Sequence, residues 1–171
     1  MDYNEMIELL KEDLSEKRFQ HSVNTMKEAV ELAKKYGVDE DKARKAGLLH
    51  DCGKLKNERV GALEHAGLGA KLVKTKYNIY DEDIVNAILY HTTGRTNMSM
   101  LEKIVFIADK IESGRDYEGV EELRKEAYLD IDKAIIMSLE RTMEYLKEIG
   151  AAIDDRSRET LEYLKESCNN M

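Results

Sequence analysis

The segment Gly47-Leu48-Leu49-His50-Asp51-Cys52-Gly53-Lys54 decides how this sequence is interpreted, because it sets a histidine beside an aspartate after an apolar run. An isolated His-Asp pair is weak evidence, since such pairs occur by chance in many chains. This chain, however, has only four histidines. The other three and one further aspartate fall where a two-metal site would need them: His21, His65, His91 and Asp109. The interpretation rests on this whole set.

The composition favours a single helical domain. A length of 171 residues suits one domain with a substantial core, and 36% charged residues indicate a heavily charged surface. The chain has no proline, and alternation of the kind found in strands is scarce. We therefore predict one all-α domain over residues 1–171, with a metal-binding core at about 16–115 and C-terminal helices at about 118–168.

Charge and apolar patterning narrow the classes of partner. A net charge of -8 argues against a nucleic acid bound through a general basic face, although metal cations can still attract a phosphate substrate. No apolar stretch approaches the length of a membrane span, and the first residues lack the apolar run of a signal peptide. The two cysteines, Cys52 and Cys168, have no motif spacing, which favours reduced thiols in a cytoplasmic protein.

Apolar residues recur at helical spacing almost throughout the chain. The spacing predicts eight helices. Seven lie at about 7–14, 16–36, 39–51, 62–77, 81–91, 131–148 and 156–167, and the sixth in chain order starts near Ser99 and carries Asp109 in its second half. Gly37 is a suitable C-terminal stop, Asp39 and Asp81 are suitable N-caps, and Ser99 with Glu102 predicts a capping box. Loops are expected at residues 92–97 and 113–117.

The four histidines lie on separate predicted helices or at their ends, and helices packed around one core can direct such residues into a common cavity. Asp109 follows the apolar run 104–108, so we expect it to be partly buried. A buried carboxylate needs a metal or a cationic partner, because desolvating an unpaired charge is costly. An ion pair from Asp109 to Lys110 or Arg115 is therefore the alternative. Nitrogen and carboxylate ligands suit iron, manganese, zinc, cobalt or nickel.

On these residues the chain resembles the HD superfamily of metal-dependent phosphohydrolases, since the order His21, His50-Asp51, Asp109 matches its signature. It is most similar to the YqeK-type branch, the bacterial symmetrical bis(5'-nucleosyl)-tetraphosphatases. The matching segments cover nearly the whole chain: Arg18-Phe19-Gln20-His21-Ser22, Leu49-His50-Asp51-Cys52-Gly53-Lys54, His65-Ala66-Gly67-Leu68-Gly69-Ala70, His91-Thr92-Thr93-Gly94, Ile107-Ala108-Asp109-Lys110-Ile111-Glu112, Arg115-Asp116-Tyr117-Glu118-Gly119-Val120 and Leu129-Asp130-Ile131-Asp132-Lys133-Ala134.

The resemblance implies a single-domain helical bundle of the HD type with a dinuclear metal site. One metal would be held by His21, His50, Asp51 and Asp109. The second would be held by His65 and His91, with Asp51 bridging the two. The resemblance favours two iron ions and implies hydrolysis of diadenosine tetraphosphate and related dinucleoside polyphosphates to nucleoside diphosphates, which here means two molecules of ADP.

The mechanistic hypothesis is attack on phosphorus by a hydroxide that bridges the two metals. Asp51, Lys54 and Arg115 are the expected catalytic residues, with Lys54 binding phosphate or stabilising the leaving group. The expected contacts to substrate come from four cations and two hydroxyls: Arg18, Lys54, Arg95, Arg115, Thr92 and Thr93.

Three other functions remain as alternatives. The first is another nucleotide phosphohydrolase or phosphodiesterase on the same scaffold, which substrate profiling would separate. The second is a di-iron oxygenase, which the loop cations and Lys54 disfavour and oxygen dependence would test. The third is a nucleotide-binding module without turnover, which has no support while all six ligand positions are occupied. The sequence leaves open whether the protein forms a homodimer, which metal is native and which base is preferred.

Overall fold

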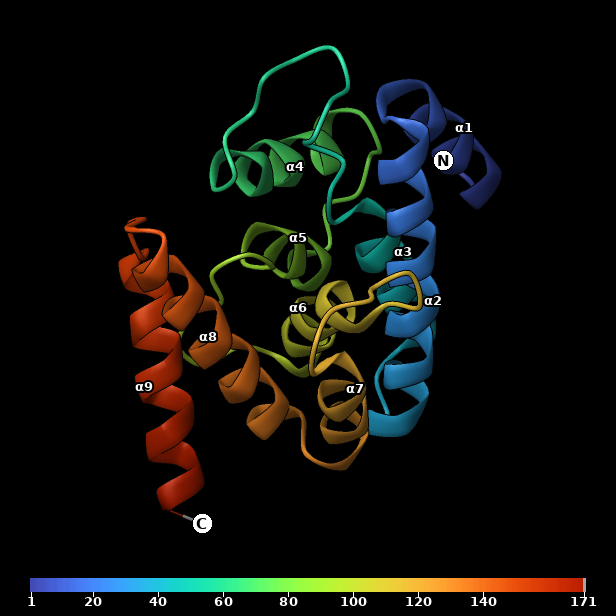
Figure 1. Ribbon diagram of the computed structural model, residues 1–171. Coiled ribbons are helices and arrows are strands. Elements are labelled where there is room, and N and C mark those ends of the chain that lie inside the picture. The colour runs from blue at the N-terminus through green and yellow to red at the C-terminus, as the bar shows by residue number, and fades with distance from the viewer. Residues whose placement is uncertain (171) are drawn as a thin grey trace.

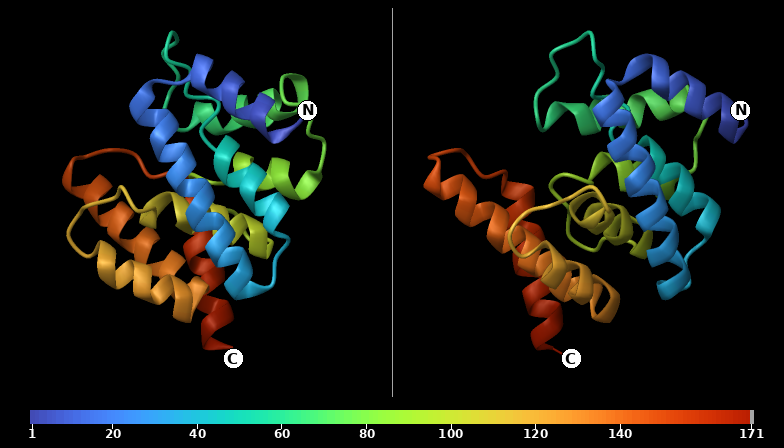
Figure 2. Two further views of the ribbon diagram at one scale, coloured as in Figure 1. Left: turned by 90° about the vertical axis from the view of Figure 1, so that its right-hand side faces the viewer. Right: turned by 45° about the vertical axis from the view of Figure 1, so that its right-hand side comes forward.

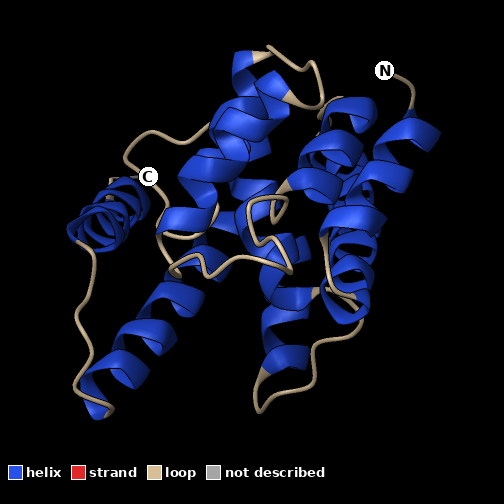
Figure 3. Cartoon of the chain, turned by 90° about the horizontal axis from the view of Figure 1, so that it is seen from above, coloured by secondary structure: helices blue, strands red, loops and turns tan. Residues whose placement is uncertain are grey.

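The computed structural model describes residues 1–170, and the elements in them are helices joined by loops (Figures 1 and 3). In chain order they are α1 (Tyr3–Asp13), α2 (Glu16–Tyr36), α3 (Glu40–Leu49), α4 (Glu64–Thr75), α5 (Glu82–Leu89), α6 (Met100–Ile111), α7 (Val120–Leu129), α8 (Ile131–Glu148) and α9 (Asp155–Asn169). The predicted all-α fold is confirmed. None of the helices within residues 1–170 combines the length and apolar character needed to cross a bilayer.

Helix α6 is the centre of the fold. Nine of its twelve residues are buried, and α2, α3, α5, α7 and α8 all pack against it. A helix that is apolar on nearly every face must be enclosed by its neighbours, which explains the run Ile104–Ala108 in the sequence. The C-terminal helices lie at the opposite end of the molecule from α1 and α4 (Figure 2). Because neighbouring helices enclose α6, Asp109 near its end is held in the interior.

Most helix boundaries follow from capping residues visible in the sequence. The side chains of Ser15, Asp39, Asp81 and Ser99 each accept a hydrogen bond from a backbone N–H in the first turn that follows. One prediction needs correction: Ser99 caps α6, but Glu102 does not complete a capping box. The Glu102 carboxylate is buried and accepts hydrogen bonds from the guanidinium of Arg95.

Helix α7 was not predicted from the sequence. It begins after Gly119, which has a φ of 87° and offers no side-chain cap, so the usual start signal is missing. The helix depends on tertiary packing, since its buried residues Val120, Leu123 and Ala127 face α8 and α6. Two glutamates in its first turn, Glu121 and Glu122, add a favourable interaction with the helix dipole.

The turn after Asp51 packs tightly against α4. A Cβ atom on Gly53 would lie 2.1 Å from the His65 carbonyl oxygen and 2.8 Å from the Gly69 nitrogen, both of which are backbone atoms. Neither can move without displacing α4, which holds His65. Close approach of backbones at Gly53 therefore sets the spacing between two parts of the candidate site.

We expect Gly53→Ala to lower the free energy of unfolding by about 3 kcal/mol, the upper end of the cost of overpacking. Urea unfolding of the metal-free protein measures this. Gly67→Ala is the control, because Gly67 is exposed on α4 and its added Cβ would meet nothing within 4 Å. Gly67→Ala should be neutral or stabilising by up to about 1 kcal/mol through helix propensity. Equal stabilities for the two variants would contradict the packing argument.

Candidate metal centre

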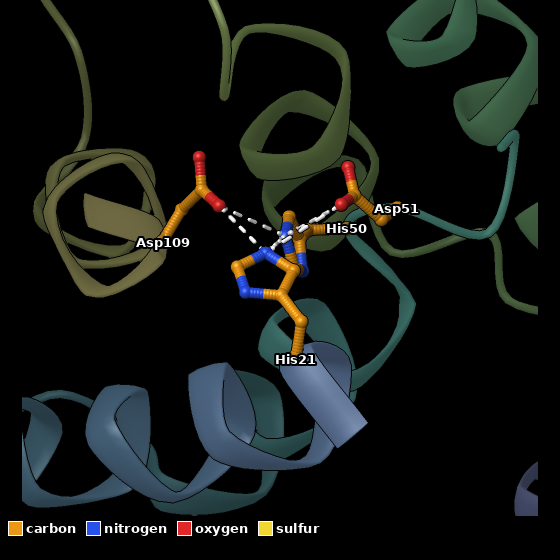
Figure 4. A group of neighbouring side chains, drawn as sticks. All are labelled: His21, His50, Asp51 and Asp109. Atoms are coloured by element: carbon orange, nitrogen blue, oxygen red, sulfur yellow. Dashed lines mark hydrogen bonds and ion pairs between the residues drawn. The ribbon is translucent and has the colours of Figure 1, made fainter. Parts of the chain in front are cut away.

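Four side chains from three parts of the fold meet in a first cluster (Figure 4). His21 comes from α2, His50 and Asp51 follow the end of α3, and Asp109 comes from α6. The Nε2 atoms of His21 and His50 are 3.2 Å apart. Asp109 Oδ1 lies 2.9 Å from His21 Nε2 and 3.4 Å from His50 Nε2, and Asp51 Oδ2 lies 3.5 and 3.4 Å from the same two atoms.

A second cluster shares the Asp51 carboxylate. The Nε2 atoms of His65 and His91 are 3.1 Å apart, and each lies 3.3 Å from Asp51 Oδ1. Asp51 therefore turns one oxygen toward each cluster. All three side chains are buried. The six residues expected as ligands from the sequence are brought together in the two groups that the resemblance implies.

The ends of α3 and α5 orient two of the histidines. Both helices stop one or two residues earlier than predicted, at Leu49 and Leu89, so His50 and His91 lie just beyond them. His50 Nδ1 lies 2.8 Å from the Gly47 carbonyl oxygen, and His91 Nδ1 lies 2.6 Å from the Ile88 carbonyl oxygen. A carbonyl oxygen can only accept, so each Nδ1 donates and each Nε2 faces the cluster.

Glu112 orients His21 in the same way. Its Oε2 lies 2.8 Å from His21 Nδ1, and the glutamate is 2% exposed. Sequence reasoning missed this residue, although Asp109 and Glu112 are three residues apart at the end of α6 and so point to neighbouring places. A carboxylate behind a ligating histidine sets its tautomer and raises its basicity.

The donor set fits a metal ion. With Nδ1 donating in His21, His50 and His91, each of these imidazoles presents a lone pair on Nε2 when it is neutral, so nitrogen and carboxylate lone pairs would converge without a hydrogen atom between them. A cation stabilises such an arrangement, either a metal ion or, where none is bound, a proton on one of the imidazoles. In the second cluster, His65 Nδ1 is buried and has no partner among residues 1–170, so no protein contact assigns its tautomer. Imidazole and carboxylate donors suit first-row transition metals.

The pKa values of His50, Asp51 and Asp109 show that the carboxylates favour a positive charge beside them. Burial alone would lower the pKa of His50, but the carboxylates of Asp51 and Asp109 outweigh it and raise that pKa to about 10. Burial opposes ionisation of Asp51, yet the charge on His50 and its histidine hydrogen bonds hold the pKa well below the usual range. The Asp109 pKa is lowered too, because Lys110 and His21 overcome its burial. Both carboxylates are ionised at neutral pH.

Three cations lie against these carboxylates. Arg18 Nη1 is 3.1 Å from Asp51 Oδ2, Lys110 Nζ is 2.7 Å from Asp109 Oδ2, and Arg115 Nη2 is 3.3 Å from Asp109 Oδ1. Both alternative partners of Asp109 therefore bind it, in addition to the histidines. Lys110 was not predicted as a site residue. Cations that already border the ligand carboxylates are suitably placed to meet an anionic substrate.

The remaining predicted contacts differ in their surroundings. Lys54 lies in a turn instead of a continued helix, is half-buried, and its Nζ has no hydrogen-bonding partner within the described chain. Thr92 Oγ1 is 3.4 Å from His91 Nε2. Thr93 is buried, and its hydroxyl donates to the Gly94 carbonyl. Arg95 forms an ion pair with Glu102, and its Cζ atom lies 4.5 Å from the centre of the Tyr90 ring. These internal partners do not support phosphate contacts from Thr93 and Arg95.

Glu112→Gln should lower the affinity of the first cluster for a metal ion by about 10-fold or more, the scale for lost orientation of a ligating histidine. An amide is a weaker acceptor than a carboxylate for the His21 Nδ1 proton. Competition with a chelator measures metal affinity. Glu118→Gln, at an exposed position in the connection after α6, is the control and should behave as wild type. If both variants hold metal equally, Glu112 does not orient His21.

Comparison with known proteins agrees with this geometry. The HD domain family matches residues 18–114, which include all six clustered residues. A protein of Halalkalibacterium halodurans named bis(5'-nucleosyl)-tetraphosphatase, symmetrical, is 40% identical over 85% of this chain and 88% of its own length. Its namesake in Bacillus subtilis is 38% identical over the same shares. A crystal structure from Clostridium acetobutylicum, described as a predicted HD superfamily hydrolase involved in NAD metabolism, is 39% identical, covers 98% of both chains and superimposes with a TM-score of 0.91.

The match over residues 18–114 defines the class: this is an HD-domain protein, and the predicted single HD-type helical fold is confirmed. The chain belongs, within that class, to the family of the proteins named symmetrical bis(5'-nucleosyl)-tetraphosphatase, and the family resemblance noted in the sequence is thereby confirmed.

Proposed function

We propose that this protein hydrolyses diadenosine tetraphosphate and related dinucleoside polyphosphates at the central bridge. Water adds to one of the two central phosphorus atoms, the bridging oxygen leaves with the other half, and two molecules of ADP result. The observation that supports this most is the Asp51 carboxylate, whose two oxygens belong to two separate ligand clusters. The names of the relatives add the substrate class.

The residues divide into those that hold metal and those that meet phosphate. Two metal ions, when bound, supply hydroxide at neutral pH and neutralise charge on phosphate oxygens. Around them, Arg18, Lys110 and Arg115 already lie against the ligand carboxylates. A tetraphosphate adds several negative charges, so these cations and Lys54 would turn toward it when Asp51 and Asp109 serve as metal ligands. Lys54 is the best candidate to stabilise the departing diphosphate, because no protein group within residues 1–170 binds its Nζ.

We infer iron as the native metal from the resemblance noted in the sequence. The ligand set of histidine nitrogens and carboxylate oxygens supports any of iron, manganese, cobalt, nickel or zinc on chemical grounds. Metal analysis of protein purified without added metal, followed by reconstitution with each ion, tests the assignment. Highest turnover with iron kept reduced is the expected result.

The products of diadenosine tetraphosphate test the function directly. Reconstituted protein is incubated with the substrate, and nucleotides are separated by ion-exchange chromatography. The Asp51→Asn protein, purified in parallel, controls for contaminating kinases that interconvert ADP with ATP and AMP. ADP alone is expected. ATP with AMP would show an asymmetrical hydrolase, and absence of any product would direct attention to other nucleotides and then to oxygen-dependent chemistry.

A further inference from the structure

A groove of about 300 Å³ lies beside the first ligand cluster and shares with it only Lys110 and Arg115, the two cations that contact Asp109. It is bordered by the end of α6, the connection 112–119 and α8, which are neighbours in the fold (Figure 2). Its deepest residues are the buried Leu123 and Ser138. This volume is at the lower end of the range for small-molecule sites and is enough for a nucleoside.

The charge of the groove is unusual for this protein. Three cations line it, Lys110, Arg115 and Arg141, and no carboxylate does, although the chain has a net charge of -8. Their carboxylate partners lie outside the lining: Asp109 for Lys110 and Arg115, and Glu122, 2.9 Å from Arg141 Nη2 and exposed. The larger groove at the start of α2, of about 710 Å³, has a mixed lining that includes Glu16 and Glu112. An all-cationic lining in an acidic protein favours an anionic ligand.

The groove is continuous with the metal centre through two of these cations. Lys110 and Arg115 line it and, at the same time, contact Asp109 of the first cluster. Arg115 Nε also donates to the Asp109 backbone carbonyl at 3.0 Å, which holds the guanidinium at this edge. A diphosphate that begins at the cluster would therefore pass these two side chains before it reached the groove.

Two tyrosines provide aromatic surface in the groove. Tyr117 is 41% exposed, and its hydroxyl donates to the Lys110 carbonyl at 2.6 Å, so the ring is held in place. Tyr145, on α8, is 59% exposed, and its hydroxyl has no partner in the described part of the chain. Exposed rings next to cations are the usual means of binding a base without strong sequence preference.

We propose that this groove binds the nucleoside end of a nucleoside diphosphate whose phosphates lie along Lys110 and Arg115, with its base stacked on Tyr117 or Tyr145. The assignment rests on the proposed function, because the groove would bind the half of the substrate whose terminal phosphate reacts. It adds the residues that would recognise the base, which neither the ligand clusters nor the family match identifies.

The test compares ADP with pyrophosphate, measured by titration calorimetry on the metal-loaded protein. Tyr145→Ala should lower the affinity for ADP about tenfold, the scale for loss of one stacked base, and leave the affinity for pyrophosphate unchanged. Tyr145→Phe retains a ring and should bind ADP as wild type does. Tyr80→Ala is the control, because Tyr80 is 65% exposed and lies outside the groove.

These outcomes are separable from failure of the proposed function. If diadenosine tetraphosphate is not hydrolysed but Tyr145→Ala still loses ADP selectively, the groove stands and the reaction is reassigned. If hydrolysis occurs and Tyr145→Ala and Tyr117→Leu both bind ADP and turn over substrate with unchanged KM, the groove is excluded. Equal losses for ADP and pyrophosphate, or no binding of ADP to the wild-type protein, also exclude it.

Discussion

Asp51→Ala is expected to remove both metals and to reduce hydrolysis of diadenosine tetraphosphate by roughly 10⁴-fold or more, because activated water and transition-state charge neutralisation are lost together. Asp51 contributes Oδ2 to the cluster with His21 and His50, and Oδ1 to the cluster with His65 and His91. No other residue in the two groups belongs to both. Metal content by mass spectrometry and steady-state turnover are measured on the same reconstituted sample.

Comparison with Asp109 sharpens this experiment. Asp109 belongs to the first cluster alone, so Asp109→Ala should lose one metal and retain the other. Asp116→Ala, at an exposed carboxylate in the same part of the chain, should retain both metals and full activity. An Asp51→Ala protein with two metals and normal turnover would show that the clusters are not the reaction centre.

Lys54→Ala is expected to retain both metals and to lower kcat by about 10²- to 10³-fold, the scale for removing one preorganised charge from a transition state. Lys54 follows Asp51 by three residues in a turn, and its backbone N–H donates to the Asp51 carbonyl at 2.9 Å. The backbone thus holds it near the bridging carboxylate, while its ammonium has no protein partner among residues 1–170.

Two variants separate charge from position in this prediction. Lys54→Arg keeps the charge and should recover part of the rate. Lys56→Ala removes an exposed cation two residues away and should be close to wild type. A Lys54→Ala enzyme with wild-type kcat and KM would remove this residue from the mechanism, and loss of metal from it would indicate a structural role instead.

The sequence was a good guide to the helices and to the six side chains that the structure brings together in two clusters. Caps such as Ser15, Asp39 and Asp81 act within one turn, so local hydrogen bonding places those helix starts. Helix α7 begins after Gly119 without a side-chain cap and was missed, whereas α4, which also lacks one, was predicted from its apolar spacing. The four histidines were identifiable as a group because they are so few.

The substrate contacts were less predictable, since they depend on which partner each long side chain finds in space. Arg95 lies in a loop that suggested a phosphate contact, yet Glu102 from α6 binds it. Glu112 was missed although it lies three residues from Asp109, because its carboxylate meets His21 only where α6 packs beside α2. Neither pairing has a local signature in the chain.

By itself, the sequence determined that the protein is helical and where most helices begin. It also determined which six side chains have the chemistry of metal ligands. These properties depend on residue type and on neighbours within one or two turns. Only the tertiary structure decided that Asp51 faces two clusters and that Glu112 supports His21. It also decided that Lys110, Arg115, Tyr117 and Tyr145 share one groove. Such contacts join residues distant in the chain, and they arise from the packing of α2, α3, α6 and α8 around a common core.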